Sequence, residues 1–372
     1  PLGQGLANAV GMALAEAHLA ARFNRDDHRV VDHRTYVIAS DGDLMEGISH
    51  EGASLAGHLG LGKLVVFYDD NRITIEGATD LAFSEDVGRR FEAYGWHVQR
   101  VADGNDLAAL DAATLAAQAE TARPSLVIVR THIAFGSPNK QDTAEAHGAP
   151  LGKDEIALTK RAYGWPADES FRVPDAARAH CAGCVERGAQ LEAAWRCRVA
   201  AHEAALPALA AEWRAALAGE LPQGWDTVLP DFGPKDGAQA TRAVSGKILN
   251  ALAPVIGTLV GGSADLAPSN NTYLTGSPDL SAAHPEGRNL HFGIREHGMG
   301  GVLNGMALHG GVRPYGATFL VFADYMRPAI RLAAMMGLPV IYVFTHDSIG
   351  LGEAGPTPPP LEPLAALRAL PH

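Results

Sequence analysis

Apolar and polar residues alternate along this chain in blocks that predict a repeating α/β structure. Residues 36–39 and 64–68 are short, continuous apolar runs with the length of buried parallel strands. Residues 96–101 and 125–130 are predicted to supply further strands. Stretches of helical length and pattern stand before or between them, at residues 6–23, 46–59 and 106–120. Because parallel strands need crossover connections, this part of the chain is predicted to form a doubly wound parallel sheet.

The pattern changes twice after residue 160. From about Phe171 to Asp236 the residues are rich in Ala, Glu and Arg and then in Pro and Gly, which is typical of a helical connector followed by a loop. From Thr241 onward an α/β pattern returns, with a strand predicted at residues 255–260. We therefore predict an α/β protein with two doubly wound parallel-sheet domains joined by a helical connector. The predicted divisions are residues 1–160, 161–238 and 239–372.

Composition narrows the class of protein without identifying its chemistry. The chain has 372 residues, of which 47% are hydrophobic and 19% charged, an ordinary balance for a globular protein. No apolar run approaches the roughly 20 residues of a membrane span, so we expect no membrane partner. The net charge of −12 argues against a nucleic-acid partner.

The cysteines indicate a compartment. Cys181, Cys184 and Cys197 are few and fit a reducing cytoplasm. Cys181 and Cys184 have the spacing of half a zinc site, but the sequence has no second pair to complete it. We therefore interpret the pair as a chance occurrence in the connector helix.

Candidate chemistry begins where the first two predicted strands end. Asp41 and Gly42 follow the first strand, and Asp70 and Asn71 follow the second. Ligands of such sheets bind at the carboxyl ends of the strands, so the Asp41 carboxylate and the Asn71 amide oxygen are expected side by side. Two hard oxygen ligands suit Mg²⁺ or Ca²⁺, with a backbone carbonyl, water or phosphate groups completing the shell. The alternative is that both dipeptides are ordinary turns.

Longer motifs around these positions resemble the transketolase family. Residues 40–51, 59–64 and 67–77 match the family nearly residue for residue. Four later blocks follow in the family's order, at residues 261–270, 289–299, 315–325 and 343–353. The resemblance implies a thiamine diphosphate-binding fold, with a diphosphate-binding domain first and a pyrimidine-binding domain last. It also implies transfer of a two-carbon ketol unit from a ketose phosphate to an aldose phosphate, as in the pentose phosphate pathway.

The same resemblance assigns roles to individual residues. Glu296 is implied as the carboxyl group that hydrogen-bonds to the cofactor's aminopyrimidine ring, and burial is expected to raise its pKa. His147 and Glu46 are the other implied catalytic residues, His147 for proton transfer to the substrate and Glu46 as an acid linked across a dimer. The implied thiamine diphosphate ligands are Leu2, Asp41, Gly42, Glu46, Asn71, His147, Asp265, Leu266, Glu296, Phe319, Phe322 and Tyr325. The implied ligands of Mg²⁺ (or Ca²⁺) are Asp41, Asn71 and Ile73, and the implied sugar-phosphate contacts are His147, Arg242, Ser269 and His346.

Three of these residues form an aromatic stripe. Phe319, Phe322 and Tyr325 stand at i, i+3 and i+6, which places their rings on one side of a helix or turn. Such a stripe alone is typical of a hydrophobic core. The resemblance implies instead a wall against the flat aminopyrimidine ring.

Two features of the sequence leave the activity of this chain open. Pro1 and His372 both fall inside the family's domains, so we expect a central piece of a longer polypeptide or one half of a split enzyme. Ala354 and Pro358 replace an aspartate and a histidine with which the family contacts the donor sugar. The alternatives are a catalytically impaired fragment or a related carboligase of the dihydroxyacetone synthase type. The family's active sites lie between subunits, which implies a homodimer.

Overall fold

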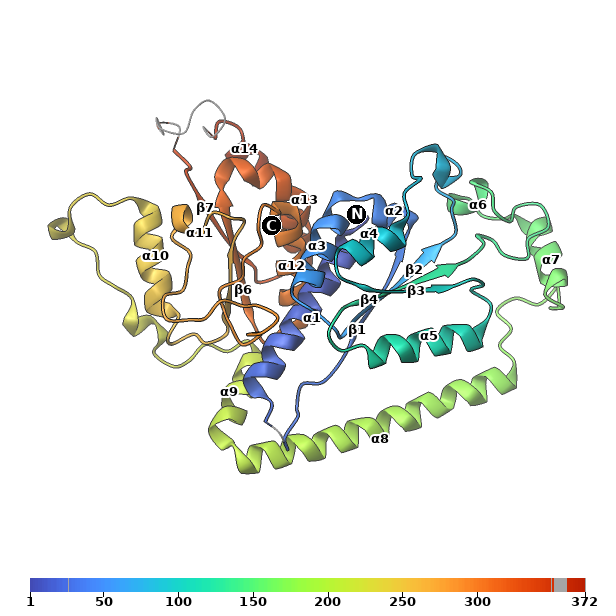
Figure 1. Ribbon diagram of the computed structural model, residues 1–372, viewed down its shortest axis with the longest axis horizontal. Coiled ribbons are helices and arrows are strands. Elements are labelled where there is room, and N and C mark those ends of the chain that lie inside the picture. Colours follow the sequence, from blue (N-terminus) through green and yellow to red (C-terminus); the bar gives the residue numbers. More distant parts are fainter. Residues whose placement is uncertain (26, 349, 351–359, 372) are drawn as a thin grey trace.

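Two parallel β-sheets organise the chain in the computed structural model (Figure 1). The structure describes residues 1–25, 27–348, 350 and 360–371. The strands of the first sheet are β1 (Thr35–Ser40), β2 (Leu64–Asp70), β3 (His97–Val101) and β4 (Ser125–Arg130), in the order β1-β2-β4-β3. All three pairings are parallel, as the apolar runs predicted.

Helices cover both faces of the first sheet. They are α1 (Gln4–Phe23), α2 (Asp41–Met45), α3 (Gly47–His58), α4 (Val87–Ala93), α5 (Leu107–Ala119), α6 (Glu145–Gly148) and α7 (Lys153–Ala162), with a 3₁₀ turn η1 (Thr79–Leu81). Val65 and Val127 belong to the core on the side of α5, whereas Leu64 and Val66 belong to the core of the opposite face. Because side chains alternate along a strand, burial on both faces explains the continuous apolar runs.

The second sheet is smaller. Its strands β5 (Leu259–Ser263), β6 (Arg313–Phe319) and β7 (Ile341–Thr345) pair in parallel in that order. Its helices are α10 (Thr241–Leu252), α11 (Ala267–Asn270), α12 (Glu296–His309), α13 (Ala323–Met336) and α14 (Pro363–Arg368), with a 3₁₀ turn η4 (Leu320–Phe322).

The strand predicted at residues 255–260 is wrong in position. The N–H groups of Val255 and Ile256 donate to the carbonyl of Leu252, so this apolar segment closes the end of α10. Strand β5 begins only at Leu259. Ile256 is nevertheless buried, which explains why the segment looks like a strand in sequence.

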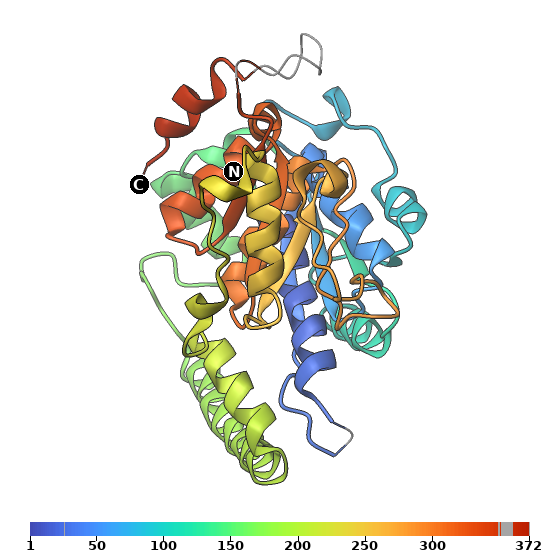
Figure 2. The same ribbon diagram turned by 90° about the vertical axis from the view of Figure 1, so that its left-hand side faces the viewer.

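The connector consists of a long helix and a short one. Helix α8 (Asp175–Ala205) and helix α9 (Pro207–Ala218) are followed by the 3₁₀ turns η2 (Trp225–Val228) and η3 (Pro234–Asp236). Figure 2 shows α8 and α9 projecting from the body beside the last turns of α1. Trp195 Nε1 donates to the carbonyl of Val30 at 3.0 Å, and His202 Nε2 to that of Phe23 at 3.0 Å. The three cysteines are exposed on α8, and no helix of the described residues is long and apolar enough to cross a membrane.

Helices α1 and α12 bring the two sheet-bearing regions together through glycine. A Cβ atom at Gly11 would overlap the carbonyl oxygen of Val302, and one at Gly305 would overlap that of Asn8. The two helix backbones therefore touch, which larger side chains would prevent. This contact fixes the position of Glu296, the first residue of α12, relative to the first sheet.

Candidate cofactor and active site

A cavity of about 540 Å³ opens where β1 and β2 end. Its lining includes seven residues that the sequence singled out: Leu2, Asp41, Gly42, Glu46, Asn71, Ile73 and His147. They come from the loop before α1, from α2, from the loop after β2 and from α6. Asp41 and Asn71 line this one cavity beyond the ends of β1 and β2.

Asp41 is the most tightly held of these residues. Its side chain is buried, with Oδ1 accepting from the Tyr68 hydroxyl at 2.5 Å and Oδ2 from the Arg72 N–H at 3.0 Å. Burial raises the pKa of Asp41, and these two hydrogen bonds oppose that rise. The pKa of Tyr68 is also raised, chiefly by burial, so this phenol keeps the proton that it donates.

The Asn71 amide oxygen is fixed in a similar way. It accepts from the Ile73 N–H at 2.9 Å, which directs the side chain into the turn after β2. Among the described residues, no group of three or more His, Cys, Asp or Glu side chains could hold a metal ion. A cation at this rim would therefore need the amide oxygen, a main-chain carbonyl and ligands from outside the protein. The donors are all hard oxygens, so they fit Mg²⁺ or Ca²⁺.

The loop that carries Leu2 is anchored against α2 and α3. Gly3 has a φ of 72°, and a Cβ there would approach Ile48 and Ser49 to 2.8 Å. Its N–H donates to Asp43 Oδ1 at 2.9 Å, while the other carboxylate oxygen accepts from the Ser40 N–H at 2.9 Å. Only glycine combines this left-handed backbone with such close neighbours.

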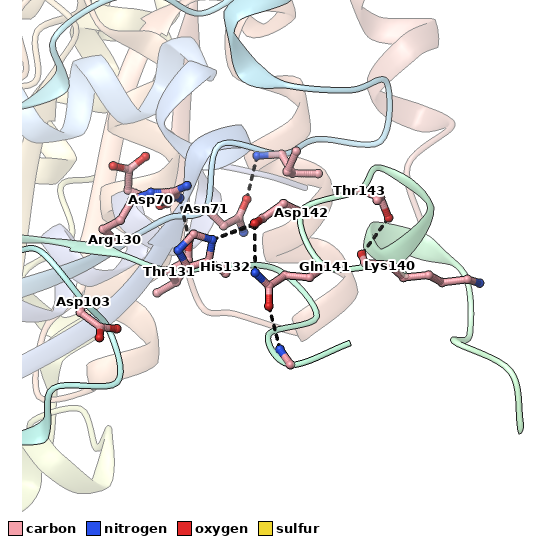
Figure 3. A network of polar contacts seen from close by, with 12 residues as sticks. Asp70, Asn71, Asp103, Arg130, Thr131, His132, Lys140, Gln141, Asp142 and Thr143 are labelled. Atoms are coloured by element: carbon pink, nitrogen blue, oxygen red, sulfur yellow. Dashed lines mark hydrogen bonds and ion pairs between the residues drawn. The ribbon is translucent and has the colours of Figure 1, made fainter. Parts of the chain in front are cut away.

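Figure 3 shows the polar contacts of the segment that leads from β4 toward α6, the helix that carries His147. Arg130 Nη1 donates to the carbonyl of Asp70 at 2.8 Å. Within the loop, His132 Nδ1 lies 2.8 Å from Asp142 Oδ2. We call this pair the loop clasp. It joins the two ends of the segment between β4 and α6, the helix that carries His147.

Glu296 lies in the second region, at the start of α12. It is 8% exposed, and its Oε1 accepts from the Thr318 hydroxyl at 3.3 Å. Burial raises the pKa of Glu296, as expected for a carboxyl group that keeps or shares a proton at neutral pH.

A second acid, which the sequence analysis missed, approaches Glu296 from the first region. Glu51 Oε2 accepts from the Gly298 N–H at 2.6 Å, and burial together with the charge of Glu296 raises the pKa of Glu51. A signal for it exists in the sequence. Glu51 stands three residues after Ile48 and four before Leu55, both buried, so it is a charged residue on an apolar helix face.

The aromatic stripe is a set of rings in mutual contact. Phe319 ends β6 and stacks on Phe322 with centroids 5.6 Å apart, and Phe322 meets the edge of Tyr325 at 6.1 Å. The ring centroids of Phe319 and His346 lie 3.8 Å apart. Arg242 Nη1 donates to His346 Nε2 at 3.0 Å, so the two candidate phosphate contacts are paired with each other.

Asp265 lines a separate cavity of about 410 Å³ with Ser263, Tyr273 and His291. Its φ of 59° is left-handed, a conformation that Asp tolerates better than most residues. Leu266 and Ser269 lie beside it, at and within the short helix α11. Each of the two cavities is thus lined by one sheet-bearing region. The predicted contacts around Ala354 and Pro358 lie outside the described residues.

Comparison with known proteins matches the whole chain. Residues 1–222 match the family model described as transketolase, thiamine diphosphate binding domain, and residues 237–372 match the transketolase pyrimidine binding domain. The transketolases of Geobacillus stearothermophilus and Bacillus subtilis are each 54% identical over 373 residues, which is 100% of this chain and 56% of those proteins. The chain therefore spans about half the length of the relatives it matches.

Solved structures agree with this assignment. Transketolase from Leishmania mexicana is 47% identical with a TM-score of 0.97, over 100% of this chain and 55% of that one. Transketolase mutants from Pichia stipitis, in complex with xylulose 5-phosphate, are 45% identical with a TM-score of 0.97, over 100% and 56% of the respective chains. On the strength of both family models and of these relatives, the chain belongs to the transketolase family.

Proposed function

We propose that this chain carries the cofactor-binding part of an enzyme that transfers a two-carbon ketol unit from a ketose phosphate to an aldose phosphate. The observation that carries the proposal is the cavity at the ends of β1 and β2, where seven predicted ligands meet. Membership of the transketolase family supplies the reaction class.

The first cavity is the proposed diphosphate and metal site. Asp41, Asn71 and the Ile73 carbonyl would hold Mg²⁺ (or Ca²⁺), and Gly42 leaves room for the diphosphate. A Cβ at Gly42 would approach Leu2 Cδ1 to 3.0 Å, so a larger residue would crowd the loop before α1. Thiamine diphosphate, when bound, supplies a nucleophilic carbon that can accept the ketol unit.

Three residues are proposed to manage protons. Glu296 would hold or share a proton with the aminopyrimidine ring, a role supported by its burial and raised pKa. His147 lines the cavity and would exchange a proton with the substrate oxygen. Glu46 lines the same cavity and lies near His297 of α12. Burial lowers the pKa of His297, and the charge of Glu46 partly opposes this decrease.

Arg242, Ser269 and His346 are the proposed contacts of the sugar phosphate. Arg242 offers a planar set of donors, one of which already reaches His346. The complex of the Pichia stipitis relative with xylulose 5-phosphate supports a sugar phosphate as the substrate class.

We also propose a homodimer with active sites between subunits. The first cavity is lined only by the first sheet-bearing region, and the second cavity only by the second region. A complete site needs residues of both regions, and a partner chain could supply one of the two. Light scattering at micromolar concentration, with cofactor and Mg²⁺ present, is expected to give the mass of two chains. A monomer under these conditions would count against this assembly.

Ketol transfer from xylulose 5-phosphate to ribose 5-phosphate tests the reaction directly. The 372-residue chain is expected to be slow, because Ala354 and Pro358 lack polar groups for the donor hydroxyls and each unpaired hydroxyl costs about 1–3 kcal/mol. The double change Ala354→Asp, Pro358→His is expected to raise the rate. Ordinary enzyme rates without the change, and no gain with it, would refute this account of donor recognition.

A further inference from the structure

Two histidines face each other on the side of the sheet away from the cavities. His33 precedes β1, and His309 ends α12, so the pair joins the two sheet-bearing regions at the amino ends of the strands. Their Nε2 atoms lie 2.8 Å apart. The rings are inclined by only 17° with centroids 5.0 Å apart, which is the arrangement of nearly coplanar imidazoles whose Nε2 atoms point at each other.

The hydrogen bonds of His309 fix its tautomer. Its Nδ1 lies 2.9 Å from the carbonyl oxygen of Gly310, and since a carbonyl only accepts, Nδ1 carries the proton. In neutral His309, Nε2 therefore has a free lone pair aimed at His33. Metal-bound histidines are oriented in the same way, by donating their other N–H to a carbonyl or carboxylate.

A cluster of charged side chains lies beside His33. Lys63 Nζ lies 2.7 Å from Glu16 Oε1 and 2.7 Å from Asp32 Oδ1, so two carboxylates flank one ammonium group. Arg29 and Arg34 also lie near Asp32, so cations offset the two carboxylates of this cluster. Glu16 is 2% exposed, which limits the screening of its charge by water.

We propose that His33 and His309 form a two-histidine site for a late first-row divalent ion such as Zn²⁺ or Cu²⁺, which tethers the two regions. Imidazole nitrogen suits these ions, whereas the oxygen ligands of the first cavity suit Mg²⁺. Because the described residues contain no cluster of three or more acidic, His or Cys ligands, water would complete the shell.

The site needs only small changes to accept the ion. Nitrogens bound to one tetrahedral ion at about 2.0–2.1 Å lie about 3.3 Å apart, roughly half an ångström more than the present separation. His33 is exposed, so its ring can turn by that amount. His33 must also move its proton from Nε2 to Nδ1, a tautomer change that releases no proton to solvent.

Calorimetric titration of the full chain with Zn²⁺ tests the proposal, with thiamine diphosphate and Mg²⁺ in excess to fill the other site. We expect one saturable site per chain, and we expect His33→Gln and His309→Gln each to weaken it at least about 10-fold. His58→Gln and His180→Gln are matched controls on other exposed histidines and are expected to leave the affinity unchanged.

Spectroscopy of the Cu²⁺-loaded chain provides a second readout that does not depend on affinity. Electron paramagnetic resonance is expected to show coupling to two imidazole nitrogens in the unchanged chain and to one in either variant. Circular dichroism of each variant checks that it is folded. Equal Zn²⁺ affinity in a folded His33→Gln variant, or no saturable binding to the unchanged chain, would overturn the proposal.

Discussion

The two sheet-bearing regions present different chemistry to the proposed cofactor. In the first, oxygen atoms at the strand ends are fixed by neighbouring donors, as Asp41 is by Tyr68 and Arg72. In the second, a buried acid and a stack of rings dominate, and Glu296 accepts a hydrogen bond of 3.3 Å from Thr318. The difference teaches that a rigid polar rim is suited to holding charge, whereas an apolar pocket is suited to changing a protonation state.

The largest effect expected from this comparison is loss of cofactor binding in Asp41→Ala. Removing the carboxylate takes away a metal ligand and leaves the diphosphate without its metal bridge, so Mg²⁺-dependent binding of thiamine diphosphate should be abolished. Calorimetry measures the affinity. Asp80→Asn, an exposed neighbour on η1, controls for loss of local charge. Unchanged affinity in Asp41→Ala would remove the rim as the binding site.

Glu296→Gln is expected to separate chemistry from binding. Without an ionisable carboxyl group beside the aminopyrimidine ring, the rate of ketol transfer should fall by about 10²–10⁴-fold, while cofactor affinity changes little. Steady-state kinetics measures the rate of ketol transfer, and calorimetry on the same preparation measures the affinity for thiamine diphosphate. Glu92→Gln on the exposed face of α4 is the matched control. A loss of affinity as large as the loss of rate would erase the distinction between the two regions.

His18 tests whether the two regions unfold as one unit. It is buried on α1, its Nδ1 donates to the carbonyl of Pro285 in the second region at 3.0 Å, and burial lowers its pKa to about 4. The unfolded chain therefore takes up a proton near pH 6.5 and the folded chain only near pH 4. The contribution of His18 to the free energy of unfolding is therefore fully present above pH 6.5. It decreases as the pH falls toward 4, in total by on the order of 3 kcal/mol.

His18→Gln is expected to reduce that pH dependence, because the amide can still donate to Pro285 but does not titrate. Urea unfolding of both proteins above pH 6.5 and near pH 4 measures the difference. Parallel loss of stability in the two proteins would show that other groups are responsible. Two separate unfolding transitions would show that the regions behave independently.

The smallest effect is expected at the loop clasp. His132 and Asp142 are each 37% exposed, so His132→Asn should lose at most about 1 kcal/mol, a change in kcat/KM of no more than about fivefold. Asp103→Asn is the control, since its carboxylate accepts from Asn105 in its own loop. An unchanged kcat/KM would mean that the loop positions His147 without the clasp.

Much of the fold follows from local pattern. Strands β2 and β4 are predictable because both of their faces are buried, which leaves continuous apolar runs. Asp41 and Asn71 are predictable as partners because parallel strands end at one edge. The start of β5 is not predictable from the apolar run at residues 255–260. The first residues of this run close the end of α10, and only the last two join β5.

The residues that sequence reasoning missed depend on distant contacts. Tyr68 belongs to a buried strand and looks like core, and only the folded chain shows its hydroxyl on Asp41. Glu51 meets Gly298 across 247 residues of sequence. Separations of this kind leave no periodic signal, because the partner lies in another domain.

The close approach of α1 and α12 has a consequence for recombination between related genes. The two helices meet backbone to backbone at Gly11 and Gly305, yet the long connector helix α8 lies between them in sequence. A crossover within α8 therefore inherits one helix from each parent. Chimeras of this kind are expected to survive only where both parents have small residues at the meeting points. The connector helix, though largely exposed, is therefore a poor place to exchange domains freely.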